Sequence, residues 1–296
     1  MATPSNNNNL GKKDRREAAR EKARQDREAE RKRVRRNKIF LQGGVGLAVI
    51  AIAAIVMLVI VNQPKPVELS TSKAGPANMI SDGILLVGNT TTAVTTPGIK
   101  AGAEPVPTDP SKYSATVNIV SYVDFQCPVC QAFEATNGDQ IKSWVDSGIA
   151  SIEIHPISFL DPNSLGNKYS TRAANAAACV ADDQPAKFYD VMQSLFVNQP
   201  AESTPGRSDK QILDVLKGAG ASSAAITDCV KSQKFANWVA AETQRVQSAE
   251  FPNTVTPTTF RGTPTVFVDG KQYTGGVDDA AAFKAFVEAA ARAKGK

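Results

Sequence analysis

This chain of 296 residues contains few histidines and cysteines. It has one histidine, His155, and four cysteines. Cys127 and Cys130 form a C-x-x-C pair, whereas Cys179 and Cys229 stand far apart in the sequence. A structural zinc site needs a second pair of ligands at short spacing, and no such pair is present. The sequence therefore argues against zinc, and we expect neither a metal nor a cofactor.

Charged residues are absent from residues 39–61, which would form a helix about 34 Å long. That length is enough to cross a hydrocarbon core of about 30 Å. No small-x-small cleavage site follows, so we predict one uncleaved transmembrane helix rather than a signal peptide. Residues 1–38 hold 14 Lys and Arg against 6 Asp and Glu, and this basic tail is expected to stay in the cytosol.

The basic excess is confined to that tail, since the rest of the chain holds 20 basic and 23 acidic residues. We therefore do not expect a nucleic acid partner. Residues 62–112 are rich in Pro, Thr, Ser and Gly and predict an extracytoplasmic linker, with room for one short strand at 83–88. The folded domain is expected to span 113–296, which is ample for one core.

The most informative stretch is 117–134, VNIVSYVDFQCPVCQAFE. Its first half is short, apolar and β-branched and predicts a buried strand, and a helix is expected to begin at Pro128. Cys127 would then lie at a helix N-terminus, where free N–H groups and the helix dipole stabilise a thiolate. Thiol–disulfide exchange is the chemistry that suits this placement, with Cys127 as the attacking thiol and Cys130 as its resolving partner. A structural disulfide between these cysteines is the main alternative.

Downstream, the pattern predicts a strand at 149–157, a helical region over about 160–250, a strand at 265–269 and a final helix at 279–293. His155 lies on the first of these strands and is expected to be structural. Cys179 and Cys229 fall in the helical region and, outside the membrane, are expected to form a second, structural disulfide. The turn Gly262-Thr263-Pro264-Thr265 precedes the last strand, and an X-Pro bond in such a turn is a common place for a cis peptide.

The order of these features resembles the thioredoxin-fold thiol–disulfide oxidoreductases, and within them the DsbA-like branch. The segments that carry the resemblance are FQCPVCQAFE, SIEIHPISFLD, YSTRAANAAACV and RGTPTVFVDG, which are similar to the membrane-anchored members of actinobacteria. The resemblance covers residues 113–296 and implies an α/β thioredoxin fold with an inserted helical domain, preceded here by the single transmembrane helix.

The resemblance also implies residue roles. Cys127 and Cys130 match the catalytic pair, and Pro264 matches the cis-proline that packs against it. Thr263 matches the residue whose main chain binds an extended substrate, and the pair Cys179 and Cys229 matches an additional disulfide of the helical domain. Many DsbA proteins carry Pro-His between the cysteines; here the dipeptide is Pro128-Val129, which removes an imidazole that would stabilise the thiolate.

Asp124 is an acid on an otherwise apolar strand and is a candidate proton relay for Cys130. The alternative is a carboxylate at the end of the strand that reaches water.

These observations predict a membrane-anchored, extracytoplasmic oxidase that forms disulfides in exported cysteine-containing proteins. A membrane partner linked to quinones is expected to reoxidise it. A reductase or isomerase, for instance in cytochrome c maturation, is one alternative, and a non-catalytic binding or chaperone module is another.

Overall fold

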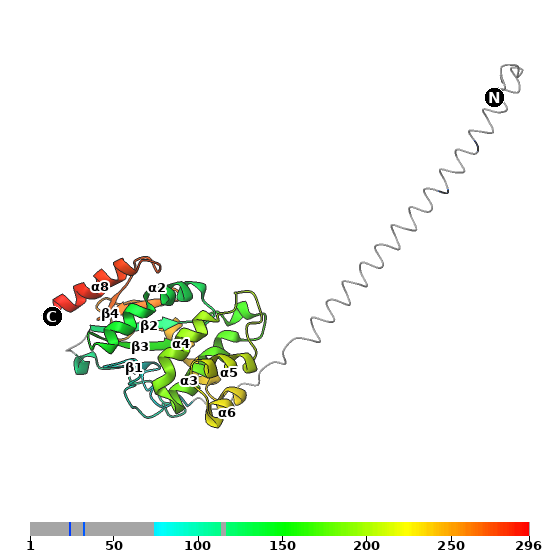
Figure 1. Cartoon of the computed structure of the whole chain (residues 1–296), viewed down its shortest axis with the longest axis horizontal. Coiled ribbons are helices and arrows are strands. Elements are labelled where there is room, and N and C mark those ends of the chain that lie inside the picture. Colours follow the sequence, from blue (N-terminus) through cyan, green and yellow to red (C-terminus); the bar gives the residue numbers. More distant parts are fainter. Residues whose placement is uncertain (1–23, 25–31, 33–73, 114–116, 296) are drawn as a thin grey trace, which may run out of the picture. The chain divides into compact units, whose positions relative to one another are not determined.

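The computed structural model describes residues 74–113 and 117–295, together with the isolated residues Arg24 and Lys32 (Figure 1). The chain divides into two units, Met1–Pro64 and Lys65–Lys296, and the fold described below belongs to the second. The predicted transmembrane helix at 39–61 and nearly all of the basic tail lie outside the described residues. Within the described residues, no helix combines the length and the apolar character needed to span a bilayer.

A five-stranded mixed sheet forms the centre of the unit, with the strand order β1-β3-β2-β4-β5. The strands are β1 (Ile84–Leu86), β2 (Val117–Val123), β3 (Ala150–Pro156), β4 (Thr265–Val268) and β5 (Lys271–Gln272). β2 and β3 run parallel, and the other three pairs are antiparallel. Parallel neighbours need a crossover, which here is the helix α2 (Pro128–Asp146).

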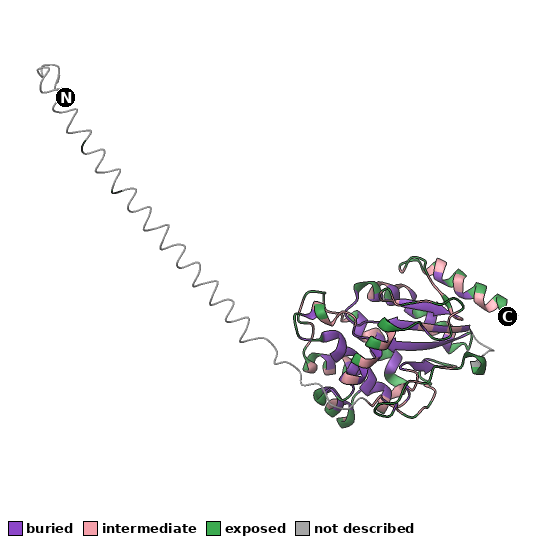
Figure 2. Cartoon of the chain, turned by 180° about the vertical axis from the view of Figure 1, so that it is seen from behind, coloured by how far each residue is buried: buried purple, intermediate pink, exposed green. Residues whose placement is uncertain are grey.

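The two faces of the sheet build separate hydrophobic clusters because side chains alternate along a strand. Ile119 and Val123 of β2 belong to the main core, together with Phe133 of α2 and Phe283 of α8 (Ala280–Ala293). Tyr122 points to the other face and belongs to a smaller cluster with Ile157, Phe251 and Phe267. Figure 2 shows that the strands are buried almost throughout, whereas the outer faces of the helices are exposed.

The region between β3 and β4 is helical, as the sequence predicts. It contains α3 (Tyr169–Asp183), α4 (Phe188–Val197), α5 (Asp209–Gly218), α6 (Ala224–Ser232) and α7 (Ala236–Ser248). Three short 3-10 helices, Pro110–Tyr113, Asp161–Ser164 and Pro185–Lys187, connect the larger elements. A capping box begins α5: the Ser208 hydroxyl accepts from the Gln211 N–H, and the Gln211 side chain accepts from the Ser208 N–H.

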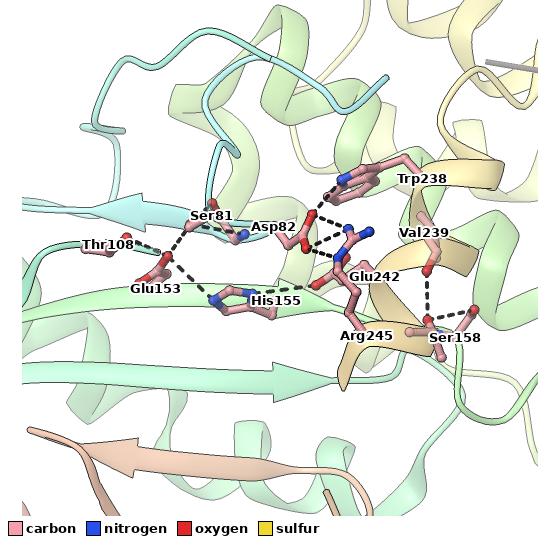
Figure 3. A network of polar contacts seen from close by, with 12 residues as sticks. Ser81, Asp82, Thr108, Glu153, His155, Ser158, Trp238, Val239, Glu242 and Arg245 are labelled. Atoms are coloured by element: carbon pink, nitrogen blue, oxygen red, sulfur yellow. Dashed lines mark hydrogen bonds and ion pairs between the residues drawn. The ribbon is translucent and has the colours of Figure 1, made fainter. Parts of the chain in front are cut away.

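The prediction that residues 62–112 are a linker is wrong for residues 74–112, which are part of the folded domain. β1 pairs antiparallel with β3, and Met79, Ile84 and Leu86 are completely buried. Asp82 joins this segment to α7, because its carboxylate accepts from Trp238 Nε1 at 2.9 Å and from Arg245 Nε at 2.8 Å (Figure 3). β1 has three residues, and its partners are distant in sequence, so local composition does not reveal that this segment packs on the domain.

Candidate redox-active site at the N-terminus of α2

The C-x-x-C pair lies at the turn between β2 and α2. Pro128 is the first residue of α2, and Cys127 is its N-cap residue, with an extended backbone at φ −78° and ψ 116°. The Cys127 sulfur accepts a hydrogen bond from the Cys130 N–H at 3.4 Å. Cys127 Sγ therefore occupies the position where the unpaired N–H groups of the helix favour negative charge.

The two thiols differ strongly in environment. Both cysteines are free, Cys130 is completely buried, and Cys127 has 5% of its surface exposed. A hydrogen bond from the Cys130 thiol, with further help from the Thr263 region and from backbone N–H groups, outweighs the effect of burial and lowers the pKa of Cys127 from 9.0 to about 6. Burial, together with the neighbouring Cys127, raises the pKa of Cys130 well above its ordinary value. Near neutral pH, Cys127 is thus the thiolate and Cys130 the protonated thiol.

The turn before β4 completes the site. β4 pairs antiparallel with β2, which brings residue 263 next to residue 127 across 136 positions of sequence. The Thr263–Pro264 peptide bond is cis, and Cys127 Sγ lies 3.2 Å from the Thr263 carbonyl oxygen, to which it donates when it is protonated. Gly262 has φ +151°, a conformation that favours glycine. The structure therefore brings together the four residues Cys127, Cys130, Thr263 and Pro264 that the sequence singles out.

Asp124 lies under this turn and is completely buried. Its carboxylate accepts hydrogen bonds from the Gln126 N–H at 2.8 Å, the Ser170 hydroxyl at 2.7 Å and the Leu160 N–H at 2.8 Å. Burial outweighs these bonds and raises the pKa of Asp124 to about 7. Because Asp124 is completely buried, the alternative in which its carboxylate reaches water is wrong. The bonds from Leu160 and Ser170 tie the active-site turn to the helical insertion.

Two glutamines near the site carry no sequence signal. Gln199, just after α4, donates from Nε2 to the Cys127 carbonyl oxygen at 2.9 Å. Gln131 of α2 donates in the opposite direction, from its Nε2 to the Phe196 carbonyl oxygen at 2.7 Å. Both bonds join residues more than 60 positions apart, so no local pattern could have identified them. Together they fix the end of α4 against the C-x-x-C turn.

Cys179 and Cys229 form a disulfide between α3 and α6, with an S–S distance of 1.99 Å. His155 lies on β3 opposite Tyr122 of β2 and contacts two buried acids, Glu153 and Glu242, each at 3.5 Å (Figure 3). Its ring also stacks on Tyr122 with a centroid distance of 4.3 Å. Burial by itself would lower the pKa of His155, but hydrogen bonds to the two acids raise it to about 9.

Comparison with known proteins identifies the family. A family model described as Thioredoxin matches residues 112–289, which is more than half of the chain. The chain belongs to the thioredoxin family.

Solved structures show the same fold. DsbA from Mycobacterium tuberculosis in its reduced form aligns with a TM-score of 0.50 and 23% identity, covering 72% of this chain and 99% of that chain. BdbD from Bacillus subtilis aligns with a TM-score of 0.52 and 18% identity, covering 75% and 100%. The fold is therefore DsbA-like, which confirms the prediction of a thioredoxin fold.

A curated relative shares part of the sequence. Serine/threonine-protein kinase PknE of Mycobacterium tuberculosis is 32% identical over 110 residues, which is 36% of this chain. The aligned part spans 19% of that kinase, about a fifth of its length.

Proposed function

We propose that this chain is an extracytoplasmic thiol:disulfide oxidoreductase that introduces disulfides into exported proteins through Cys127 and Cys130. The observation that carries the proposal is the pair of thiols itself: Cys127 at the N-terminus of α2 beside the Thr263 carbonyl, and Cys130 buried behind it. Disulfide exchange requires one attacking thiol and one resolving thiol. Here Cys127 is a stable thiolate, which suits the first role, and Cys130 is shielded from solvent, which suits the second.

In the oxidised enzyme, a substrate thiolate attacks Cys127 Sγ, and the bond between Cys127 and Cys130 breaks. The Cys130 sulfur leaves as a thiolate and takes up a proton, since its raised pKa favours the thiol. A second substrate thiolate then attacks the substrate sulfur of the mixed disulfide and releases the Cys127 thiolate. Two electrons pass from the substrate dithiol to the enzyme, and the structure described here has the resulting dithiol form.

Two neighbouring groups fit roles in these steps. Asp124 is our candidate for the proton relay, because its pKa of about 7 lets it exchange protons near neutral pH. Thr263 is proposed to bind the main chain of an extended substrate, because its backbone directly contacts the sulfur that substrate attacks.

The lowered pKa of Cys127 favours the reaction in which the enzyme oxidises its substrate. A pKa near 6 rather than 9.0 stabilises the Cys127 thiolate by about 4 kcal/mol. The disulfide carries no charge to stabilise, so the lowered pKa favours the reduced enzyme. At pH 7, where a thiol with a pKa of 9.0 would be protonated, the gain corresponds to about one pKa unit, or about 1.4 kcal/mol, and raises the potential by about 30 mV for a two-electron couple. The Val129 side chain is 44% exposed and has no polar group, so this residue lowers the pKa of Cys127 only through its backbone N–H.

The surroundings of the domain are part of the proposal. Residues 39–61 are proposed to anchor the chain in the membrane, with residues 1–38 in the cytosol and the domain outside. A quinone-linked membrane protein is the proposed reoxidising partner. The Cys179–Cys229 disulfide is consistent with an oxidising compartment and is proposed to be structural.

Trapping tests the assignment of roles. Cys130→Ser, incubated with a peptide that contains a disulfide, is expected to accumulate a mixed disulfide on Cys127, because no second enzyme thiol can release it. Cys127→Ser is the matched control and is expected to trap almost nothing, since Cys130 is buried and protonated. Equal trapping by the two variants would contradict the roles. A wild-type chain that neither oxidises peptide thiols nor reduces peptide disulfides would favour a non-catalytic binding module.

A further inference from the structure

A pocket of about 330 Å³ lies on the sheet face opposite α2, toward the N-terminal end of β2, whereas Cys127 follows the C-terminal end of that strand. Its floor comes from residues that share one face of three paired strands. Val120 of β2 lies opposite Glu153 of β3 and opposite Phe267 of β4. Ligand pockets commonly have this size and this mixture of apolar walls with a few polar groups.

Glu153 supplies the first unusual feature of the floor. Its side chain is 7% exposed, yet it lines the pocket. One oxygen, Oε1, receives the contacts: the Ser81 hydroxyl, the Thr108 hydroxyl at 2.7 Å and His155 Nε2 at 3.5 Å (Figure 3). Burial raises the pKa of Glu153, but His155 and the two hydroxyls together lower it below the ordinary value. Glu153 is therefore ionised, and its Oε2 accepts no hydrogen bond from the described residues.

Asp269 supplies the second acceptor, at the other end of the floor. Its Oδ1 accepts from the Asn118 N–H at 3.0 Å and from Lys294 Nζ at 2.6 Å. Its Oδ2 is buried and has no hydrogen-bond partner among the residues that the structure describes. A buried acceptor without a donor costs about 1–3 kcal/mol, so a ligand that donates to it would recover that energy.

The two acceptors lie at opposite corners of the floor. Asp269 is opposite Asn118, whose carbonyl accepts the Asp269 N–H at 2.8 Å, and Asn118 precedes Val120 by two residues. Two strand spacings and two residues of strand rise separate the Cα atoms of Glu153 and Asp269 by about 12 Å. Apolar side chains, among them Val120 and Phe267, lie between them. A molecule that spans the pocket thus meets an acceptor, an apolar surface and a second acceptor.

The charges at both ends are already balanced. Glu153 pairs with His155, and Asp269 pairs with Lys294. The second acid beside His155 is Glu242, and burial raises its pKa to about 8, so it is largely protonated near neutral pH and adds little charge. A cationic ligand would leave an excess positive charge in a largely buried site, which is costly. We propose that this pocket binds a small uncharged aromatic or cyclic molecule whose hydroxyl or amide N–H groups donate hydrogen bonds to Glu153 and Asp269. This site is separate from the redox-active cysteines and does not rest on the proposed function.

A pair of probes with the same ring tests the proposal. Resorcinol carries two hydroxyl donors, and 1,3-dimethoxybenzene has the same ring and oxygens without donors. The full chain in lipid nanodiscs is titrated with each compound by saturation-transfer NMR, and empty nanodiscs provide the blank. We expect saturable, millimolar binding of resorcinol and at least about tenfold weaker binding of the dimethoxy compound, because a hydrogen bond to a charged group is lost.

Three variants locate the binding. Ser111 is exposed and lines the pocket, so Ser111→Trp fills its mouth, and Glu153→Gln removes the ionised acceptor. Each is expected to weaken resorcinol binding about tenfold or more. Val197→Trp is the matched control at a residue that is 79% exposed and does not line the pocket, and it is expected to leave binding unchanged. Equal binding of the two probes, no saturable binding, or unchanged binding in Ser111→Trp would overturn the proposal. Ser111→Trp decides the matter even if Glu153→Gln unfolds.

Discussion

The lowered pKa of Cys127 can be tested by removing its main cause. The largest contribution is the hydrogen bond from the Cys130 thiol to the Cys127 sulfur. Cys130→Ala removes that donor, whereas Cys130→Ser retains a hydroxyl that can donate in the same place. The helix N-terminus and the Thr263 turn are unchanged in both variants, so the pair isolates this one hydrogen bond.

A hydrogen bond to a charged group contributes about 1.5–3 kcal/mol. Since about 1.4 kcal/mol corresponds to one pKa unit, Cys130→Ala should raise the pKa of Cys127 by about one to two units. Cys130→Ser should leave it close to that of the reduced wild-type protein, which is about 6. The thiolate is the reactive form, so the alkylation rate of Cys127 should be half its plateau when the pH equals the pKa. That midpoint should lie near pH 6 in the wild type and in Cys130→Ser, and about one to two units higher in Cys130→Ala.

The assay is the rate of iodoacetamide modification from pH 4 to pH 10, with mass spectrometry to assign the modified cysteine. Cys179 and Cys229 do not interfere while they remain joined in their disulfide. A wild-type midpoint near 8.5, the ordinary value for a free cysteine, would refute the argument. An unchanged midpoint in Cys130→Ala would refute the attribution to Cys130, even if the wild-type value is low.

Four further changes probe other parts of the structure. Replacing both Cys179 and Cys229 by Ala removes a disulfide with a sequence separation of 50 and should cost up to about 4 kcal/mol; a lower melting temperature is expected, with Cys127 alkylation unchanged. Asp82→Ala leaves Arg245 and Trp238 without their acceptor and should cost about 2–4 kcal/mol in urea unfolding, somewhat less than a fully buried ion pair because Arg245 is 31% exposed. Burial raises the pKa of Glu134 from 4.5 to about 7, so its contribution to stability is present at low pH and is lost as the pH rises through 7. In Glu134→Gln, the fall in unfolding free energy from pH 5 to pH 8 should be smaller by about 2–3 kcal/mol; an identical pH profile would contradict this. If Asp124 relays protons, Asp124→Asn should slow peptide oxidation near pH 7 without changing the alkylation plateau of the reduced enzyme.

The redox-active turn was predictable because its signals are local. A β-branched strand, a C-x-x-C pair and a proline at the first helical position determine where Cys127 lies relative to α2. The turn around Pro264 was also visible as a motif, although only the pairing of β2 with β4 places it beside Cys127.

The features that the sequence did not predict depend on contacts between distant segments of the chain. The alternating pattern of β3 would place Glu153 and His155 on a face in contact with water, yet all seven residues of the strand are buried. Segment 74–112 covers this face of β3, and its residues Ser81 and Thr108 both donate hydrogen bonds to Glu153. Its composition is that of a linker, and its packing comes from tertiary contacts that no short window of sequence contains. Gln199 was missed for the same reason.

The reduction potential of the Cys127–Cys130 pair distinguishes an oxidase from a reductase. The protein is equilibrated with glutathione buffers of known potential, and the oxidised fraction of the pair is measured by alkylation and mass spectrometry. An oxidase with a stabilised Cys127 thiolate should have a potential at or above about −180 mV, and Val129→His should raise it further. A value near about −270 mV, which is that of thioredoxin, would contradict the oxidase and indicate a reductase.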